Sequence, residues 1–166
     1  MIEGNCWWLA AVIAAHPQRR ILGRTRLQKT IKLLQRVGLP TDYRFAVFFY
    51  GPYSESIVSD VRLLECLGLV REWPLCIADG SAPSYLIEAS ETAQRGEVER
   101  FQPQIRRLQQ TDLVVLELAA TLDAYREMGS EPAEALERMR HKKASKWTEE
   151  REHRALELLA DLGLIS

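Results

Sequence analysis

A long hydrophobic run is the first feature that this sequence lacks. Its longest apolar stretches reach only residues 6–15 and 113–122, and the second already contains Glu117. A membrane-spanning helix needs roughly twenty apolar residues, so we expect no membrane contact. The N-terminus carries Glu3 where an export signal has basic residues, which predicts a cytoplasmic protein.

Recognisable catalytic and metal-binding motifs are also missing. The three histidines are isolated, and Cys6, Cys66 and Cys76 form no Cys-x-x-Cys pair of the kind that zinc sites use. The nine glycines are scattered singly, so no glycine-rich loop is available to hold a phosphate. We expect no catalytic residue, no metal and no cofactor, and we expect the cysteines to be small buried residues. An enzyme without a recognisable motif is the third functional option.

Neither disorder nor several domains fits the composition. Apolar residues make up 46% and charged residues 27% of the 166-residue chain, which is the balance of one globular domain. The apolar spacing predicts a mainly α protein with a small antiparallel β-sheet, an α+β fold. Residues 1–89 are expected to form a winged-helix-like part, and residues 90–166 a helical C-terminal part packed on it as one structural unit.

The expected elements follow from apolar spacing and from turn residues. Helices are predicted over residues 5–15, 26–37, 55–67, 91–109 with a break near Pro103, 112–128, 131–143 and 149–162. Strands are predicted over residues 43–50, 69–77 and 84–88, and the last two form a hairpin around a turn at residues 78–81. These three strands are expected to build the sheet.

Helix ends are marked by short local patterns. Residues 33–39, 63–69 and 158–164 share two leucines, then a Val-Gly-Leu or Leu-Gly-Leu stop. Such a stop places glycine in the left-handed region, and the following leucine packs back on the helix. We therefore expect a positive φ at Gly38, Gly68 and Gly163. At helix starts, Thr25 with Gln28 matches a capping box and Ser54 matches an N-cap.

Several segments also look like parts of a known family. They are Gly-Arg-Thr-Arg-Leu-Gln-Lys at 23–29, Tyr-Gly-Pro-Tyr-Ser at 50–54, the leucine-glycine stop at 63–70, and apolar segments at 115–121 and 155–165. The chain resembles the uncharacterised prokaryotic YwgA-like proteins. More distantly it resembles the Panacea (SocA-like) antitoxin and adaptor domain, which shares a Leu-Gln-Lys helix followed by a Gly-Pro turn. The resemblance implies a winged-helix-like fold and a regulatory or defence-related role, without any catalytic residue.

Charge is distributed unevenly along the chain. Residues 1–44 hold eight cations and two anions, a net charge of +6, whereas the remainder holds fourteen cations and twenty-one anions, a net charge of −7. In the predicted helix 26–37, the cations share one face and the leucines another. Such a basic stripe can track phosphates. The nucleic-acid-binding residues predicted from it are Arg24, Arg26, Lys29, Lys32 and Arg36. The alternative is a solvated helix face whose cations pair with acids of the C-terminal half.

A second basic cluster spans residues 138–146 and ends at Trp147. Basic and aromatic residues together can bind single-stranded nucleic acid by stacking. The plainer interpretation is that these cations gather at the C-terminal end of a helix, where they suit its dipole, and that Trp147 anchors the next helix.

The leading hypothesis is a non-enzymatic, winged-helix-like regulator that binds DNA. The predicted third helix, which would be the reading helix of a helix-turn-helix, weighs against it, because its net charge of −2 repels DNA. The alternative is a protein-protein interaction module of antitoxin or adaptor type, with contacts at Asp60, Arg62 and Trp73. The expected partners are therefore nucleic acid or a partner protein. Trp7, Trp8 and Trp73 would serve a homodimer.

Overall fold

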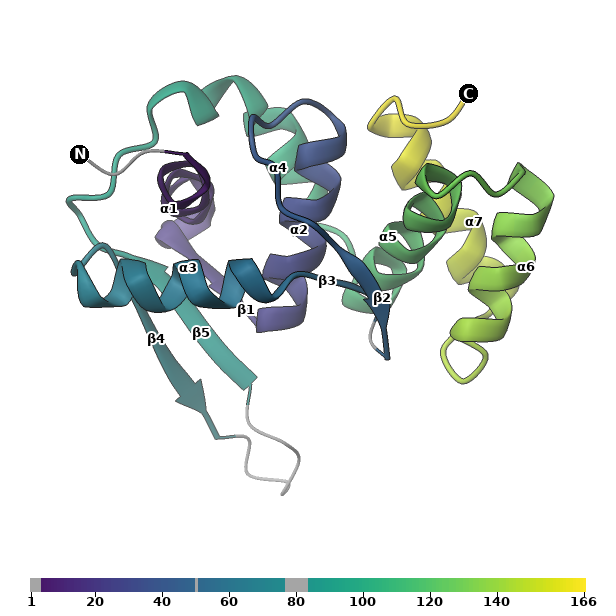
Figure 1. Cartoon of the computed structure of the whole chain (residues 1–166), viewed down its shortest axis with the longest axis horizontal. Helices are drawn as coiled ribbons and strands as arrows, with labels where there is room; N and C mark the ends of the chain where they lie inside the picture. Colours follow the sequence, from purple (N-terminus) through teal and green to yellow (C-terminus); the bar gives the residue numbers. More distant parts are fainter. Residues whose placement is uncertain (1–3, 50, 77–83) are drawn as a thin grey trace.

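The computed structural model describes residues 4–49, 51–76 and 84–166. It confirms a mainly α fold with a small antiparallel sheet (Figure 1). The helices are α1 (Asn5–Ala15), α2 (Arg24–Arg36), α3 (Glu55–Cys66), α4 (Gln102–Gln109), α5 (Leu113–Glu127), α6 (Pro132–Lys142) and α7 (Glu149–Asp161), with short 3-10 helices η1 (Pro17–Arg19) and η2 (Gly96–Phe101). Among the described residues, no helix is long and apolar enough to cross a membrane.

The sheet has three strands, but one of them is not the strand that the sequence predicts. Its order is β1-β5-β4, formed by β1 (Arg20–Leu22), β4 (Val70–Leu75) and β5 (Ser84–Ala89). The hairpin of β4 and β5 is confirmed, with Trp73 opposite Leu86. The predicted turn at residues 78–81 lies outside the described residues.

The prediction that a strand over residues 43–50 belongs to the main sheet is wrong. Among the described residues 43–49, only β2 (Ala46–Phe48) is a strand, and it pairs with β3 (Gly51–Tyr53) in a separate two-stranded hairpin with Val47 opposite Pro52. Phe48 and Phe49 are exposed. The third strand of the main sheet is instead β1, in a segment where no helix or strand is predicted, because Ile21 pairs with Ile87 and fills the core.

The elements form two groups of helices around the β2–β3 hairpin (Figure 1). In the first group, α1 contacts α3, α4, η2 and the sheet, so the first part of the C-terminal half packs on the N-terminal half. In the second group, α5 contacts both α6 and α7, and it also contacts α2 and β3. Every residue of α5 from 115 to 125 is buried, as expected for a helix that is apolar nearly all round.

The three predicted helix stops are confirmed. Gly38, Gly68 and Gly163 have φ values of 110°, 72° and 74°. After each glycine, a leucine amide donates to a carbonyl five residues earlier at 2.9 Å, as in the bond from Leu69 N to Leu64 O. This hydrogen bond satisfies a carbonyl that the end of the helix would leave free.

The predicted capping box at the start of α2 is wrong. The helix begins at Arg24 after Gly23, and Gln28 bonds to the backbone of Ser54 rather than to its own helix start. Ser54 does occupy the N-cap position of α3, but its side chain makes no capping hydrogen bond. The break predicted near Pro103 is confirmed, because η2 ends at Phe101 and α4 begins at Gln102.

Candidate functional site

The Leu-Gln-Lys and Gly-Pro-Tyr-Ser segments of the sequence meet in the structure. Gln28 and Lys29 lie on a buried face of α2, directly against the β2–β3 hairpin and the start of α3. The Gln28 amide accepts from Ser54 N and donates to Ser54 O, both at 2.9 Å. The Lys29 ammonium donates to Pro52 O at 2.6 Å. These two side chains therefore hold the Gly-Pro turn in place, which gives the motif a structural role.

Lys29 lies in a buried group of charges. Burial and the nearby Lys143 ammonium lower the pKa of Lys29 to about 8, although Glu117 opposes the shift. The Lys143 and Lys146 ammonium groups lie 3.5 and 2.8 Å from Glu117 Oε2. This group links α2 to α5 and to the end of α6.

The glycine of the Gly-Pro turn is required at this position. Gly51 has a φ of 93°, and a side-chain Cβ there would lie 2.6 Å from Thr121 Oγ1. Any other residue would be strained in its backbone and would clash with α5. The turn and α5 can therefore approach each other only because residue 51 has no side chain.

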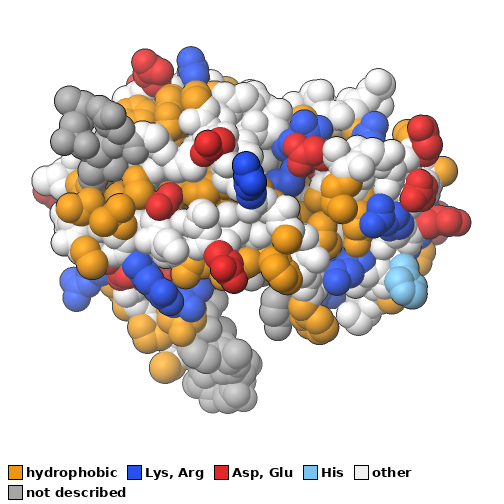
Figure 2. Space-filling model, in the orientation of Figure 1, with side chains coloured by type: hydrophobic (Ala, Val, Ile, Leu, Met, Phe, Trp, Pro, Cys, Tyr) orange, Lys and Arg blue, Asp and Glu red, His pale blue; other side chains and the backbone are white. Residues whose placement is uncertain are grey.

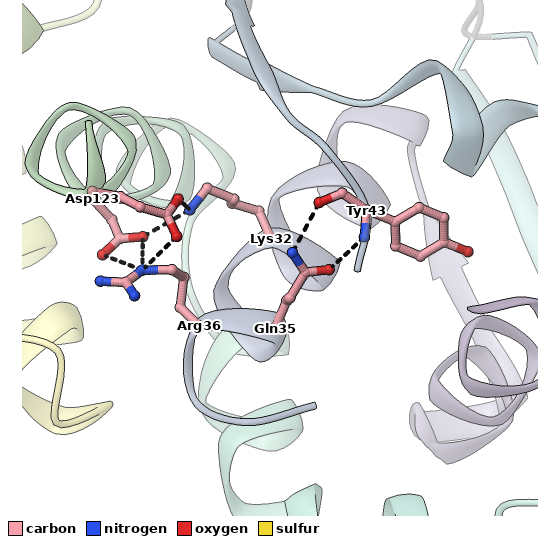
Figure 3. Close-up of polar contacts among 6 residues, drawn as sticks. Lys32, Gln35, Arg36, Tyr43 and Asp123 are labelled. Atoms are coloured by element: carbon pink, nitrogen blue, oxygen red, sulfur yellow. Dashed lines mark hydrogen bonds and ion pairs between the residues drawn. The ribbon is translucent and has the colours of Figure 1, made fainter. Parts of the chain in front are cut away.

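A second buried charge network joins α2 to α5 one turn further along (Figure 3). The Lys32 ammonium lies 3.0 Å from Asp123 Oδ2 and 2.8 Å from Glu127 Oε1. Arg36 Nε lies 2.9 Å from the same Asp123 oxygen. These pairs fit the alternative expectation, in which cations of the basic stripe pair with acids of the C-terminal half.

The other two arginines predicted to bind phosphate are also engaged within the chain. Arg24 forms an ion pair with Glu72, and its guanidinium lies 3.5 Å from the centre of the Tyr85 ring. Arg26 donates to Thr111 O at 2.9 Å and to Leu108 O at 3.2 Å.

The predicted basic stripe therefore does not lie on one solvent-exposed face. Lys29 and Lys32 are fully buried, although a helical pattern alone placed them on the same face as the more accessible Arg26 and Arg36. Neither lysine can reach a phosphate in this structure, because burial separates both from solvent. Phosphate binding by Arg24 and Arg36, which retain accessible surface, stays a prediction.

The second basic cluster is engaged as well. Arg140 forms two 2.6 Å hydrogen bonds to Glu152, and the Trp147 indole N–H donates to the same carboxylate at 2.7 Å. The Arg138 guanidinium lies 4.2 Å from the centre of the Tyr125 ring. These contacts fasten α6 to α7 and to α5, as the plainer interpretation of the cluster expects.

The three residues predicted for protein contact lie in three different settings. Asp60 accepts from the Tyr43 hydroxyl at 2.6 Å, and burial, together with this carboxylate, raises the pKa of Tyr43. Arg62 is exposed on another side of α3, at the rim of a pocket. Trp73 lies on the outer face of the sheet, beside Arg71 at 5.1 Å. The structure does not bring these three side chains together.

The outward face of α3 was not singled out from the sequence. Leu63 and Leu67 are 49% and 51% exposed, and Ser56, Ser59 and Cys66 accompany them on this face. In the view of Figure 2, hydrophobic side chains reach the surface over α3 and over the β4–β5 ribbon. The signal was present in the sequence, because Leu63 and Leu67 share a face that lies outside the arc of Ile57, Val61 and Leu64.

A pocket with an empty volume of about 580 Å³ adjoins this helix. Ile57, Val61 and Leu27 contribute apolar side chains to it, and Arg62 and Glu65 lie at its polar side. It opens between α2, α3 and the β4–β5 ribbon.

The cysteines and the N-terminal tryptophans also depart from expectation. Cys6 is buried, and burial, with a smaller effect of Asp60, raises the pKa of its thiol to about 11. Cys66 and Cys76 are exposed, so the expectation of buried cysteines is wrong for both.

Trp7 and Trp8 contact each other edge to face at 4.6 Å, and Trp7 lies against Gly96, so part of their surface is used inside the chain.

Comparison with known proteins gives one partial match. Residues of this chain are 36% identical over 52 positions to the uncharacterised protein YwgA of Bacillus subtilis (strain 168). The match covers 31% of this chain and 31% of YwgA, and no family model matches. It supports the YwgA-like resemblance, whereas the relation to the Panacea domain stays a prediction.

Within the described residues, no cluster of three or more histidine, cysteine or acidic side chains is arranged to hold a metal ion.

Proposed function

We propose that the protein is a cytoplasmic, non-enzymatic regulatory module of antitoxin or adaptor type that binds a partner protein through α3 and the β4–β5 ribbon. The observation that carries the proposal is the partly apolar outer face of α3, with Leu63 and Leu67 half exposed. Large apolar side chains that remain accessible beside a pocket are typical of protein interaction surfaces.

The electrostatics of α3 support a protein partner over DNA. The helix carries Glu55, Asp60, Arg62 and Glu65, and Asp60 is already used by Tyr43. DNA binding depends on cations that neutralise phosphates. The two most central cations of the predicted stripe, Lys29 and Lys32, are buried and bonded to groups inside the protein.

We expect the partner to contact exposed side chains of α3 rather than to add a strand to the edge of the sheet. β4 is an edge strand, but the Glu72 amide donates to the Glu65 carboxylate at 3.0 Å. Pro74 in the same strand has no amide hydrogen. Strand addition needs free edge amides, so this edge is a poor template and the exposed side chains of α3 are the better contact.

A DNA-binding winged-helix regulator is the second candidate function, and one observation favours it. The element order α1, β1, α2, β2, β3, α3, β4, β5 with sheet order β1-β5-β4 is that of a winged helix with a two-stranded wing, except that the β2–β3 hairpin lies between its second and third helices. Fold likeness alone does not determine function, so this topology supports the second candidate more weakly. An enzyme without a recognisable motif remains the third.

Affinity capture from cells that naturally make the protein tests the proposal. The tagged protein should retain a partner that Leu63→Ser/Leu67→Ser loses, because both side chains are exposed and the fold keeps its core. Met128→Ser is the matched control, since Met128 is an exposed apolar residue at the end of α5. A partner kept equally by both variants would refute docking on α3. Fluorescence anisotropy with mixed-sequence duplexes at low salt tests the second candidate, which predicts binding that weakens as salt rises.

A further inference from the structure

The outer face of the three-stranded sheet carries a row of apolar side chains. Leu22, Leu86 and Trp73 lie opposite one another on β1, β5 and β4, so their side chains project from the same face. Leu75 follows two residues after Trp73 and shares that face. Leu22 and Leu75 are 54% and 37% exposed, and the other two are half-buried. These four side chains form one accessible apolar surface, the outer sheet patch.

The helices cover the opposite face of the sheet. Ile21 and Ile87 pair with each other and are buried, and α1, α2 and α3 all contact the strands. Ile87 and Glu72 line the pocket beside Ile57 of α3, and strand alternation places both on the face opposite the outer sheet patch. The outer sheet patch and α3 therefore lie on opposite sides of the β4–β5 ribbon.

The apolar and polar residues of β4 alternate in the reverse of the usual order. An antiparallel sheet with one face on the core normally directs apolar side chains inward and polar side chains outward. In β4, Glu72 points inward and pairs with Arg24 of α2, whereas Trp73 and Leu75 point outward. Single exposed apolar residues are ordinary, but a contiguous patch across three strands is typical of a surface that another molecule covers.

Cations accompany the outer sheet patch. Arg20 and Arg71 occupy the neighbouring row of the same face, with Glu88 between them. Within the described part of the chain, neither of these two arginines forms an ion pair. Arg26 lines the hollow that adjoins the patch. Three arginines and one glutamate give this surface a net charge of +2, so an acidic partner complements it.

We propose that the outer sheet patch binds a short amphipathic helix of a partner protein, apolar on one face and acidic along its flanks. β4 and β5 pair over six residues each, a length of about 20 Å, and a helix of about 13 residues spans the same length. Its apolar side chains lie on Leu22, Leu86 and Trp73, as in other helices that bind through an apolar face. Its carboxylates meet Arg20 and Arg71, whose guanidinium groups offer paired donors.

Two other occupants fit this surface less well. A second copy of the chain would place a net charge of +2 against another of +2, and like charges across an interface repel. Single-stranded nucleic acid binds by stacking bases on aromatic side chains. The outer sheet patch offers one aromatic ring, Trp73, among three leucines, which suits aliphatic side chains better than bases.

This surface lies across the ribbon from α3, so the inference goes beyond the proposed function and its test is independent of it. Phage-displayed random peptides of about 16 residues, selected on the immobilised full chain, provide the probes. We expect the selected peptides to be net acidic and to repeat apolar residues at intervals of three and four, as one face of a helix requires. The most enriched peptide, synthesised with a fluorescent label, is then measured by fluorescence anisotropy.

Leu22→Ser/Leu75→Ser should weaken binding of this peptide at least about tenfold, and both positions are exposed, so the core is unchanged. Arg20→Gln/Arg71→Gln should also weaken it, and should reduce the loss of affinity that salt causes. Met128→Ser, an exposed apolar position on α5, is the matched control and should leave binding unchanged. Leu63→Ser/Leu67→Ser on α3 should leave it unchanged too, whether or not α3 docks a partner of its own.

Selection of no peptide, or of basic peptides only, would overturn the proposal. Equal affinity of the wild type and Leu22→Ser/Leu75→Ser would do the same, as would a loss confined to Leu63→Ser/Leu67→Ser, which would place the peptide on α3. Oligo(dT) that displaces the peptide and binds more tightly would assign the surface to nucleic acid. A dimer in sedimentation velocity that Leu22→Ser/Leu75→Ser abolishes would assign it to a second copy, and either result would refute the inference.

Discussion

Replacing Asp123 by alanine should strongly destabilise the protein. Asp123 on α5 is only 3% exposed in its side chain, and it is the shared partner of Lys32 and Arg36 on α2 (Figure 3). Its removal leaves the buried Lys32 ammonium with Glu127 alone. Breaking a buried ion pair in this way costs about 3–5 kcal/mol, because the remaining charge stays desolvated. That is a large part of the roughly 5–15 kcal/mol by which a domain of this kind is stable.

Glu127→Ala is the matched control within the same network. Glu127 also contacts Lys32, at 2.8 Å, but its side chain is 47% exposed. Solvent screening limits the value of such a pair to about 0–1 kcal/mol, so this variant should lose little stability. The double variant Lys32→Met/Asp123→Leu removes the charges together, and it should be more stable than Asp123→Ala by at least about 2 kcal/mol.

Urea unfolding followed by tryptophan fluorescence measures these differences, because the chain has four tryptophans. The slope of the free energy against urea concentration should stay the same in all variants, since they expose similar surface on unfolding. Equal losses for Asp123→Ala and Glu127→Ala would refute the account. So would a double variant no more stable than Asp123→Ala, because burial of an unpaired charge would then not be the cause.

Three further predictions concern single residues. Folding lowers the pKa of Lys29 from 10.5 to about 8, so above pH 8 the unfolded chain holds more protons and stability should rise with pH. Relative to Lys29→Met, the wild type should gain about 2 kcal/mol between about pH 7.5 and about pH 9.5 in urea unfolding. Gly68→Val should lower the melting temperature through a cost of about 1–2 kcal/mol, and that cost is one of backbone conformation because the added Cβ meets open space. Ellman's reagent should modify Cys66 and Cys76 quickly, and Cys6 only on unfolding, because Cys6 is buried with a raised pKa.

Features that depend on neighbours within one helical turn were predictable from the sequence. The stops at Gly38, Gly68 and Gly163 require only a glycine and a leucine at the right spacing, and all three have the expected backbone. The end of α1 before Pro17 follows equally from local sterics, since the residue before proline avoids helical torsions. The fold class follows from the same signals, because most of the chain is helix with clear ends.

The sequence by itself also singled out the Leu-Gln-Lys and Gly-Pro segments as parts of a family resemblance, but it did not predict that they contact each other. The tertiary structure shows that Gln28 and Lys29 hold the Gly-Pro turn, across intervals of 26 and 23 residues. Lys32 and Asp123 meet across 91 residues. A lysine on a helix looks the same in sequence whether its ammonium reaches water or a distant carboxylate, because its long apolar stem suits both places. Only the packing of α5 on α2 decided that Lys32 is buried against a carboxylate and does not reach water. Strand β1 likewise depends on its pairing with β5, since three residues carry too little local pattern to specify a strand.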